Sequence, residues 1–306
     1  MMAFLQSEEG HHTLQTAADS LRTAAEKGGE QGGNMFSELL HHVQDSHEIE
    51  LPFLGHVELP RFEPLHMAGL TVDLSITKHV VFLWLAAALL IGVAIAAAGQ
   101  NRRRRIPSGL GNLVEVFIQF TRDEIVIPNM GPRGLKYMPY LLTTFFYILI
   151  MNLLGLIPYC ASATGNVSVT AGLALIAFVM IQAAAIRAQG VGHYLAHLTG
   201  GVHWALWPIM IPIEILGLFT KPFALCIRLF ANMTGGHIVI VSLIGLIFIF
   251  KSYLIAVGPL GFVLGINFLE IFVAFLQAYI FTMLTSLFMG LGMQTEAHEG
   301  HQEHPH

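Results

Sequence analysis

From Ala205 to Met293 the sequence is apolar with almost no break, and this stretch constrains the fold more than any other. Read as upright membrane spans it would make four helices, but no polar loops separate them. Its turn signal is KSYLIAVGPLG, residues 251–261, where glycine and proline cluster. We therefore predict two very long helices, over 206–250 and 259–292, that form a hairpin. At 1.5 Å per residue the first would be about 65 Å long, twice the hydrocarbon thickness, so the hairpin must tilt steeply.

The rest of the chain also has the composition of a membrane protein. Hydrophobic residues make up 54% of the 306 and charged residues 11%, against about 25% charged residues in a typical soluble domain. Further apolar spans are predicted at 79–98, 137–158 and 167–187. An amphipathic helix over 109–127 is predicted to lie along the membrane interface. The expected fold class is an all-α polytopic membrane protein with about five membrane helices and one interfacial helix.

Charges are segregated along the chain, although the net charge of −5 is modest. Residues 1–77 are predicted to form a polar extramembrane segment, in which 51–77 make short extended pieces at the membrane surface. The membrane domain is expected over 78–293, followed by a histidine-rich tail over 294–306. Arg102–Arg105 directly follow the first span, and such a cluster marks the cytoplasmic side. This places the N-terminus outside, in the periplasm, and the C-terminus in the cytoplasm.

The first long helix carries a stripe of polar residues. Glu214, Lys221 and Arg228 are spaced by sevens and Asn232 follows four residues later, so all four share one narrow side. His237 projects from the opposite side. An arginine cannot escape hydrocarbon by losing its proton, and at the centre of a spanning helix it costs roughly 2.5–3.5 kcal/mol. The one carboxylate of the stripe lies about 21 Å along the axis, so we expect the counter-charge of Arg228 to come from another subunit.

The second long helix carries Asn267, Glu270 and Gln277 on one face. If Arg228 is level with Gln277 in an antiparallel hairpin, His237 and Glu270 come close together, about 13 Å and 10 Å from that level. A neutral histidine and a carboxylic acid at one depth in lipid can relay protons. The alternative is that the two groups bind each other and only pin the hairpin.

Several motifs resemble subunit a of the F-type ATP synthase, in order from about residue 70 to 292. They are MNLLGLIP (151–158), NVSVTAGLALIAF (166–178), PIEILGLFTKPFALCIRLF (212–230), CIRLFANMTGGH (226–237) and LEIFVAFLQAYIFTMLTSLFM (269–289).

The resemblance implies a non-catalytic stator subunit that translocates protons in the membrane sector of the synthase. Two offset half-channels would open to opposite sides of the membrane, and protons would pass between them only on the rotating ring, which couples proton flow to ATP synthesis. The implied partners are the subunit c ring, the subunit b peripheral stalk, the remaining synthase subunits and the lipid bilayer, with no nucleic acid. The implied location is the inner membrane of a bacterium, and no cofactor, metal or nucleotide is expected.

The resemblance also gives roles to individual polar residues. Members of the family differ in which long helix carries the acid and which the histidine, and this chain has the histidine first. Glu214 and Lys221 could instead form a structural ion pair. The implied roles are Arg228 facing the ring carboxylate, Asn232 and Gln277 flanking it, His237 and Glu270 in the outer half-channel together with Asn152, and Glu214 and Lys221 bordering the cytoplasmic half-channel.

One alternative function is a self-contained proton or cation transporter or channel. A transporter is expected to show inverted repeats and broken helices near the midplane, and the sequence has no internal repeat. An unpartnered Arg228 also favours the stator. An enzyme is not indicated, because the sequence contains no nucleotide-binding loop or nucleophile constellation. The histidines at both ends of the chain are predicted to be solvated rather than metal ligands.

Overall fold

The structure is a computed structural model, and five of its described helices are long and apolar enough to cross a membrane. This confirms the predicted fold class of an all-α polytopic membrane domain. The chain divides into two compact units, a smaller one of residues 1–44 with 235–269 and a larger one of 45–234 with 270–306. The described residues are 48–51, 55–58, 65–67, 70–72, 77–103, 109–157, 162–192, 194, 207–250 and 253–294.

The membrane helices are joined to two short antiparallel hairpins near the N-terminus, where the sequence predicted extended pieces. Strand β1 (Glu48–Leu51) pairs with β2 (Gly55–Glu58), and β3 (Leu65–Met67) pairs with β4 (Leu70–Val72). The five long helices are α2 (Lys78–Arg103), α5 (Met138–Gly155), α6 (Val167–Gln189), α8 (Trp207–Phe250) and α9 (Tyr253–Gln294).

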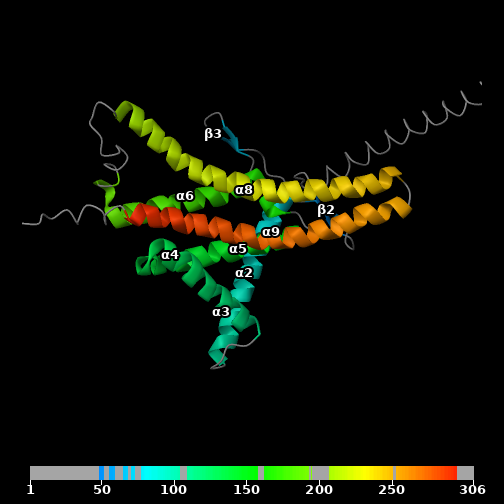
Figure 1. Cartoon of the computed structure of the whole chain (residues 1–306), viewed down its shortest axis with the longest axis horizontal. Coiled ribbons are helices and arrows are strands. Elements are labelled where there is room, and N and C mark those ends of the chain that lie inside the picture. The colour runs from blue at the N-terminus through cyan, green and yellow to red at the C-terminus, as the bar shows by residue number, and fades with distance from the viewer. Residues whose placement is uncertain are drawn as a thin grey trace, which may run out of the picture. The chain divides into compact units, whose positions relative to one another are not determined.

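In the larger unit, α2 runs at a steep angle to α5, α6 and the parts of α8 and α9 that belong to this unit (Figure 1). The Tyr147 hydroxyl of α5 donates a hydrogen bond of 3.1 Å to the Leu83 carbonyl of α2, which ties the two directions together. An upright α2 in a bilayer would therefore leave the other helices far from upright. This arrangement fits the steep tilt that the length of α8 and α9 demands.

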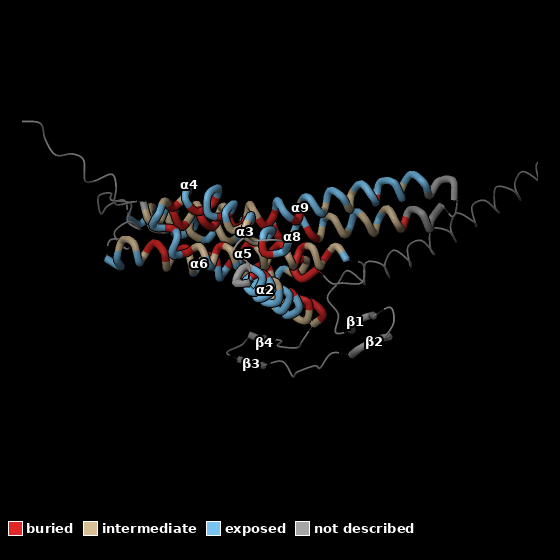
Figure 2. The backbone as a smooth tube through the Cα atoms, turned by 90° about the horizontal axis from the view of Figure 1, so that it is seen from below, coloured by how far each residue is buried: buried red, intermediate tan, exposed pale blue. Residues whose placement is uncertain are grey.

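The core of the larger unit forms where α5, α6, α8 and α9 pack together. In α5, Leu141, Phe145, Ile148 and Asn152 are buried, and their spacing of four, three and four places them on one helix face. Small residues let the partner helices approach, as at Ala278, which is fully buried. By contrast, α2 is exposed over most of its length (Figure 2). Its apolar surface suits lipid rather than water.

The structure divides the helix that was predicted over 109–127. It forms α3 (Leu110–Phe120), a π-helical turn η1 (Thr121–Val126) and one more turn, α4 (Ile127–Met130). The Ile127 N–H donates to the Arg122 carbonyl five residues back. Pro128 follows at once, and because proline lacks an N–H it cannot continue the usual ladder. The placement of this segment at the membrane interface stays a prediction.

The π-helical turn is held by α9. The buried Ile125 carbonyl accepts a hydrogen bond of 2.8 Å from the Asn129 side chain and one of 3.1 Å from the Ser286 hydroxyl of α9. Beyond Gly131, whose φ is 63°, the short 3-10 helix η2 (Pro132–Tyr137) leads into α5. Contacts far along the chain therefore stabilise a local irregularity that periodicity does not reveal.

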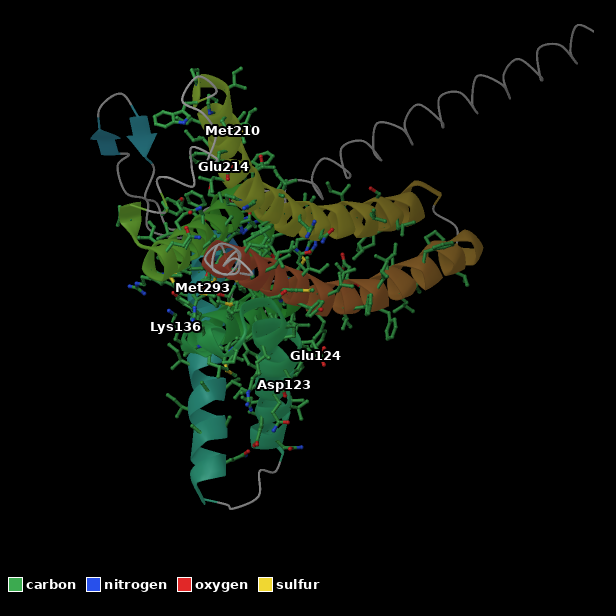
Figure 3. All side chains as sticks on the ribbon, turned by 60° about the vertical axis from the view of Figure 1, so that its left-hand side comes forward. Asp123, Glu124, Lys136, Met210, Glu214 and Met293 are labelled. Atoms are coloured by element: carbon green, nitrogen blue, oxygen red, sulfur yellow. The ribbon has the colours of Figure 1, made fainter. Side chains whose placement is uncertain are left out.

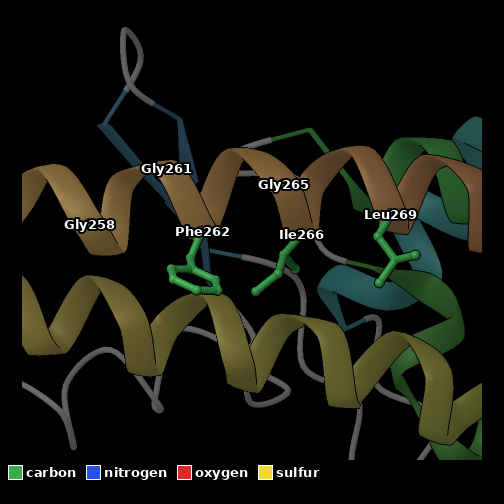
Figure 4. A pocket seen from close by; sticks show the side chains of 6 residues that line it. All are labelled: Gly258, Gly261, Phe262, Gly265, Ile266 and Leu269. Atoms are coloured by element: carbon green, nitrogen blue, oxygen red, sulfur yellow. The ribbon is translucent and has the colours of Figure 1, made fainter.

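Helices α8 and α9 are antiparallel neighbours in each unit. In the smaller unit, α9 begins at Tyr253, six residues before the predicted beginning at 259. Pro259 therefore lies inside the helix and is not its first residue. One missing hydrogen bond there does not stop the helix. Phe262 and Ile266 point toward α8 (Figure 4), and a shallow apolar groove of about 450 Å³ is lined by six residues of α9. These residues are Gly258, Gly261, Phe262, Gly265, Ile266 and Leu269.

Candidate functional site

Arg228 lies on the outer surface of α8. Its neighbours Leu225 and Leu229 are 1% and 0% exposed and pack into the core, whereas Arg228 is exposed. Within the described part of the chain the guanidinium forms no hydrogen bond or ion pair. On the inner side of the same turn, the Cys226 thiol lies 3.4 Å from the Thr170 hydroxyl of α6. The helix is therefore fastened to the bundle on one side and presents a cation on the other.

Asn232 and Gln277 join α8 to α9 one turn beyond the arginine. The Asn232 Nδ2 donates to the Gln277 Oε1 at 2.6 Å, and Gln277 is only 2% exposed. Gln277 of α9 is therefore level with Asn232 of α8 and not with Arg228. The register of the two helices differs by one helical turn from the one assumed from the sequence. A buried amide oxygen needs a hydrogen-bond donor, and the Asn232 amide supplies it to the Gln277 Oε1 while Arg228 points outward.

The amide pair leads to a prediction. Asn232→Leu or Gln277→Leu alone leaves one amide without its partner, and each is expected to lower the amount of assembled complex several-fold. The double leucine variant should lose less than the sum of the two, since it leaves no orphaned amide. Quantifying the chain in purified complexes from the four strains checks this. Additive losses would show that the pair is not coupled, and Leu276→Met, at a half-exposed neighbour, serves as the control.

Asn152 lies inside the bundle, against α9. It is 1% exposed; its Oδ1 accepts a hydrogen bond of 2.9 Å from the Thr164 hydroxyl, and its Nδ2 donates to the Ala274 carbonyl at 3.4 Å. Ala274 lies four residues after Glu270 and three before Gln277. The structure therefore brings Asn152 next to the part of α9 that carries both predicted site residues.

Glu214 and Lys221 are half-buried near the beginning of α8 and form no ion pair with each other, so the purely structural pairing is not observed in the described residues. The Lys221 Nζ lies 5.1 Å from the centre of the Phe288 ring on α9, within reach of a cation–π interaction. Glu214 lies close to Met210, one turn earlier on α8 (Figure 3), and its negative charge acts on a group outside α8.

That group is Tyr194, which sequence reasoning missed. Its hydroxyl donates to the Gln182 Oε1 at 2.6 Å. Burial raises the pKa of Tyr194 above its usual value, and the nearby negative charge of Glu214 raises the pKa further. The signal in the sequence was a lone tyrosine among histidines, which did not indicate a contact with α8.

His237 and Glu270 are both half-buried, His237 in the smaller unit and Glu270 in the larger one. The proton relay between them stays a prediction. Asn267 is half-buried in the smaller unit. Among the described residues no group of histidine, cysteine and carboxylate side chains could hold a metal ion.

Comparison with known proteins decides the family. The profile of the family described as ATP synthase A chain matches residues 80–290. The chain belongs to this family. ATP synthase subunit a of Chloroherpeton thalassium is 51% identical over 270 residues, which cover 87% of this chain and 79% of that protein. ATP synthase subunit a 2 of Chlorobaculum tepidum is 50% identical over 290 residues, 93% of this chain and 80% of the relative.

A more distant relative extends the match. ATP synthase subunit a of Anaeromyxobacter dehalogenans is 47% identical over 308 aligned residues, 95% of this chain and 79% of that protein. As a member of the ATP synthase A chain family, the chain is a subunit of the membrane sector of an F-type ATP synthase. It is a multi-pass protein of a bacterial inner membrane and assembles with other synthase subunits.

Proposed function

We propose that this chain is the stator subunit that couples proton flow to rotation, with Arg228 facing the carboxylate of a subunit c ring. The observation that carries the proposal is an exposed arginine on a largely apolar helix, without a hydrogen-bond or ion-pair partner in the described part of its own chain. A permanent cation facing hydrocarbon costs several kcal/mol. An anion on a neighbouring subunit offsets that cost.

The fixed cation would control the ring carboxylate by electrostatics. A positive charge favours the ionised carboxylate, so each arriving carboxylate releases its proton before it passes Arg228. Arginine does not titrate, and it therefore blocks direct proton transfer between the two half-channels, whereas a buried lysine could lose its proton. The Asn232–Gln277 pair, one turn away, would hold α8 and α9 in register behind the cation.

Two offset half-channels complete the proposal. His237, Glu270 and Asn152 would line the outer one, and Glu214 and Lys221 the cytoplasmic one. In this role the chain binds no nucleotide, and its partners are the subunit c ring, the subunit b stalk and the bilayer. The N-terminus would lie in the periplasm and the C-terminus in the cytoplasm, as Arg102–Arg105 indicate.

Oxidative cross-linking tests which face of α8 meets the ring. Cys160 and Cys226 are first replaced by serine, and one cysteine is placed in the ring subunit a helical turn from its carboxylate. Ala224→Cys, one turn before Arg228 and exposed on the same side of α8, is expected to form a disulfide with the ring cysteine. A disulfide needs Cα atoms within about 7 Å, so only residues at the interface react. Gel electrophoresis of the assembled complex measures the yield.

The matched control is Leu229→Cys, which faces the core and is 0% exposed. It should give no cross-link. Equal yields from both positions, or a product only from Leu229→Cys, would contradict the proposed orientation of α8.

A further inference from the structure

A chain of buried hydroxyl and amide groups connects the turn before α6 with α9, and none of the roles above uses its hydroxyls. Thr164 is fully buried and Ser162 is 8% exposed. Both belong to the short segment around the 3-10 helix η3 (Ala163–Gly165), between α5 and α6. The hydroxyls of Ser162 and Thr164 are 3.2 Å apart, and Thr164 in turn reaches Asn152. Buried polar groups that fully satisfy one another usually fix a geometry.

The direction of these hydrogen bonds follows from proton counting. Thr164 has one hydroxyl proton and donates it to the Asn152 Oδ1. Ser162 must therefore be the donor in its contact with Thr164. If the Asn152 amide were turned over, its oxygen would face the Ala274 carbonyl, and two acceptors would meet. The Ala274 carbonyl, which can only accept, therefore selects the amide orientation, and the Thr164 hydroxyl holds the Oδ1 at the other end of the same amide.

A glycine lets the two segments approach. A Cβ added to Gly155 would lie 2.8 Å from the Ser162 Oγ and 2.9 Å from the Met233 Cε of α8. On the other side, the Asn166 Oδ1 accepts from the Ser168 N–H at 2.8 Å and caps α6. The η3 segment is held from both ends, so its hydroxyls have little freedom to turn away.

We propose that Ser162 and Thr164 are positioning residues for the outer proton path. They hold the Asn152 side chain by its Oδ1, so that its Nδ2 stays on the Ala274 carbonyl of α9, on the turn that follows Glu270. This inference rests on the proposed function, because it gives Glu270 a role in proton transfer. Of the elements that contact η3, α2 carries Lys78 and His79 in its first turn and Arg102 and Arg103 at its far end, α5 carries no charged residue, and α6 carries only Arg187 at its far end. On α9, which Asn152 reaches, the charged residue is Glu270.

The test compares Thr164→Val with Thr164→Ser in membrane vesicles that contain the assembled complex. Valine keeps the shape but leaves the Asn152 Oδ1 buried without its donor, so acid-driven ATP synthesis should fall about tenfold. Half-maximal synthesis should also need a lower pH on the outer side, with the dependence on inner pH unchanged. Serine keeps the hydroxyl and should stay within about twofold of the parent.

The order of the two variants separates positioning from packing. If Thr164 only filled space, valine would match the parent and the smaller serine would be worse, because a methyl-sized cavity costs stability. The expected order is the reverse. A matched control is Thr285→Val, since the buried Thr285 hydroxyl donates within its own helix, to the Phe281 carbonyl. It should leave synthesis within about twofold of the parent.

A second variant keeps the inference testable if Thr164→Val does not assemble. Ser162→Ala removes only the first donor and is expected to lower synthesis about threefold, with the same shift toward lower outer pH. Parental rates and outer-pH profiles in Thr164→Val, or in Ser162→Ala where that variant is used, would overturn the inference. Arg228→Ala in the same vesicles tests the proposed function separately. An inactive Arg228→Ala beside a parental Thr164→Val would leave the function standing and remove only the positioning role.

Discussion

Vesicles carrying Arg228→Ala are expected to lose ATP-driven proton pumping by about 100-fold or more while the complex stays assembled. Removing one partner of a desolvated charge pair typically costs 3–5 kcal/mol, because the other charge is left uncompensated. Here the uncompensated charge is the proposed ring carboxylate. Because Arg228 is exposed and forms no hydrogen bond or ion pair within the described part of the chain, its removal should not disturb the bundle. Acidification measured with a pH-sensitive dye, beside the content of assembled complex, reports both effects.

Passive proton conductance under an imposed potential gives the second readout for the same variant. It should rise, since the fixed cation no longer separates the half-channels. Arg228→Lys keeps a charge that can titrate, so we expect intermediate pumping and a smaller leak. Phe223→Ala, exposed on the same helix, is the neutral control. Pumping near the parental rate in Arg228→Ala would mean that the arginine is a structural charge.

Gly290→Ala is expected to have the largest effect on stability. The added Cβ would overlap the carbonyl oxygen of Asn129, which is backbone and cannot rotate aside. Overpacking of this kind costs typically 1–3 kcal/mol, so the amount of chain recovered in the complex should fall about fivefold or more. Quantitative immunoblotting of purified complexes measures the loss.

Gly265→Ala is the matched control on the same helix. A methyl group there meets no atom within 4 Å, and alanine is the better helix former. Its complex should be recovered at parental levels or slightly above. Equal recovery of the two variants would show that α9 and α4 do not approach as closely as the structure has them.

The membrane helices could be predicted from the sequence because lipid leaves few choices. Every backbone polar group must be satisfied within the chain, so a long apolar run becomes a helix. The same argument could not find the π-helical turn over Thr121–Val126, which depends on a hydroxyl of Ser286 more than a hundred residues away. Nor could it place the beginning of α9 at Tyr253, because proline discourages a helix locally but does not forbid it.

The candidate site was only partly predictable for a similar reason. Arg228 is conspicuous because a charge in an apolar run is costly. The register of α8 and α9 is not evident from the sequence, since it depends on which amide partner the buried Gln277 meets, here Asn232. Thr164 and Ser162 carry no charge and lie in a short polar segment that periodicity treats as a loop. Their importance appears only once Asn152 and α9 are placed beside them.

The fastening of α8 on its inner side has a mechanical consequence. A stator must supply a reaction force equal and opposite to the torque on the moving ring, and in the proposed role that force enters through the surface around Arg228. The residues directly behind it, Leu225 and Leu229, are almost completely enclosed by the core. Close-packed interiors have low compressibility. The force is therefore passed to α5, α6 and α9 together. In the proposed role, Arg228 would keep its position while the subunits of the ring move past it.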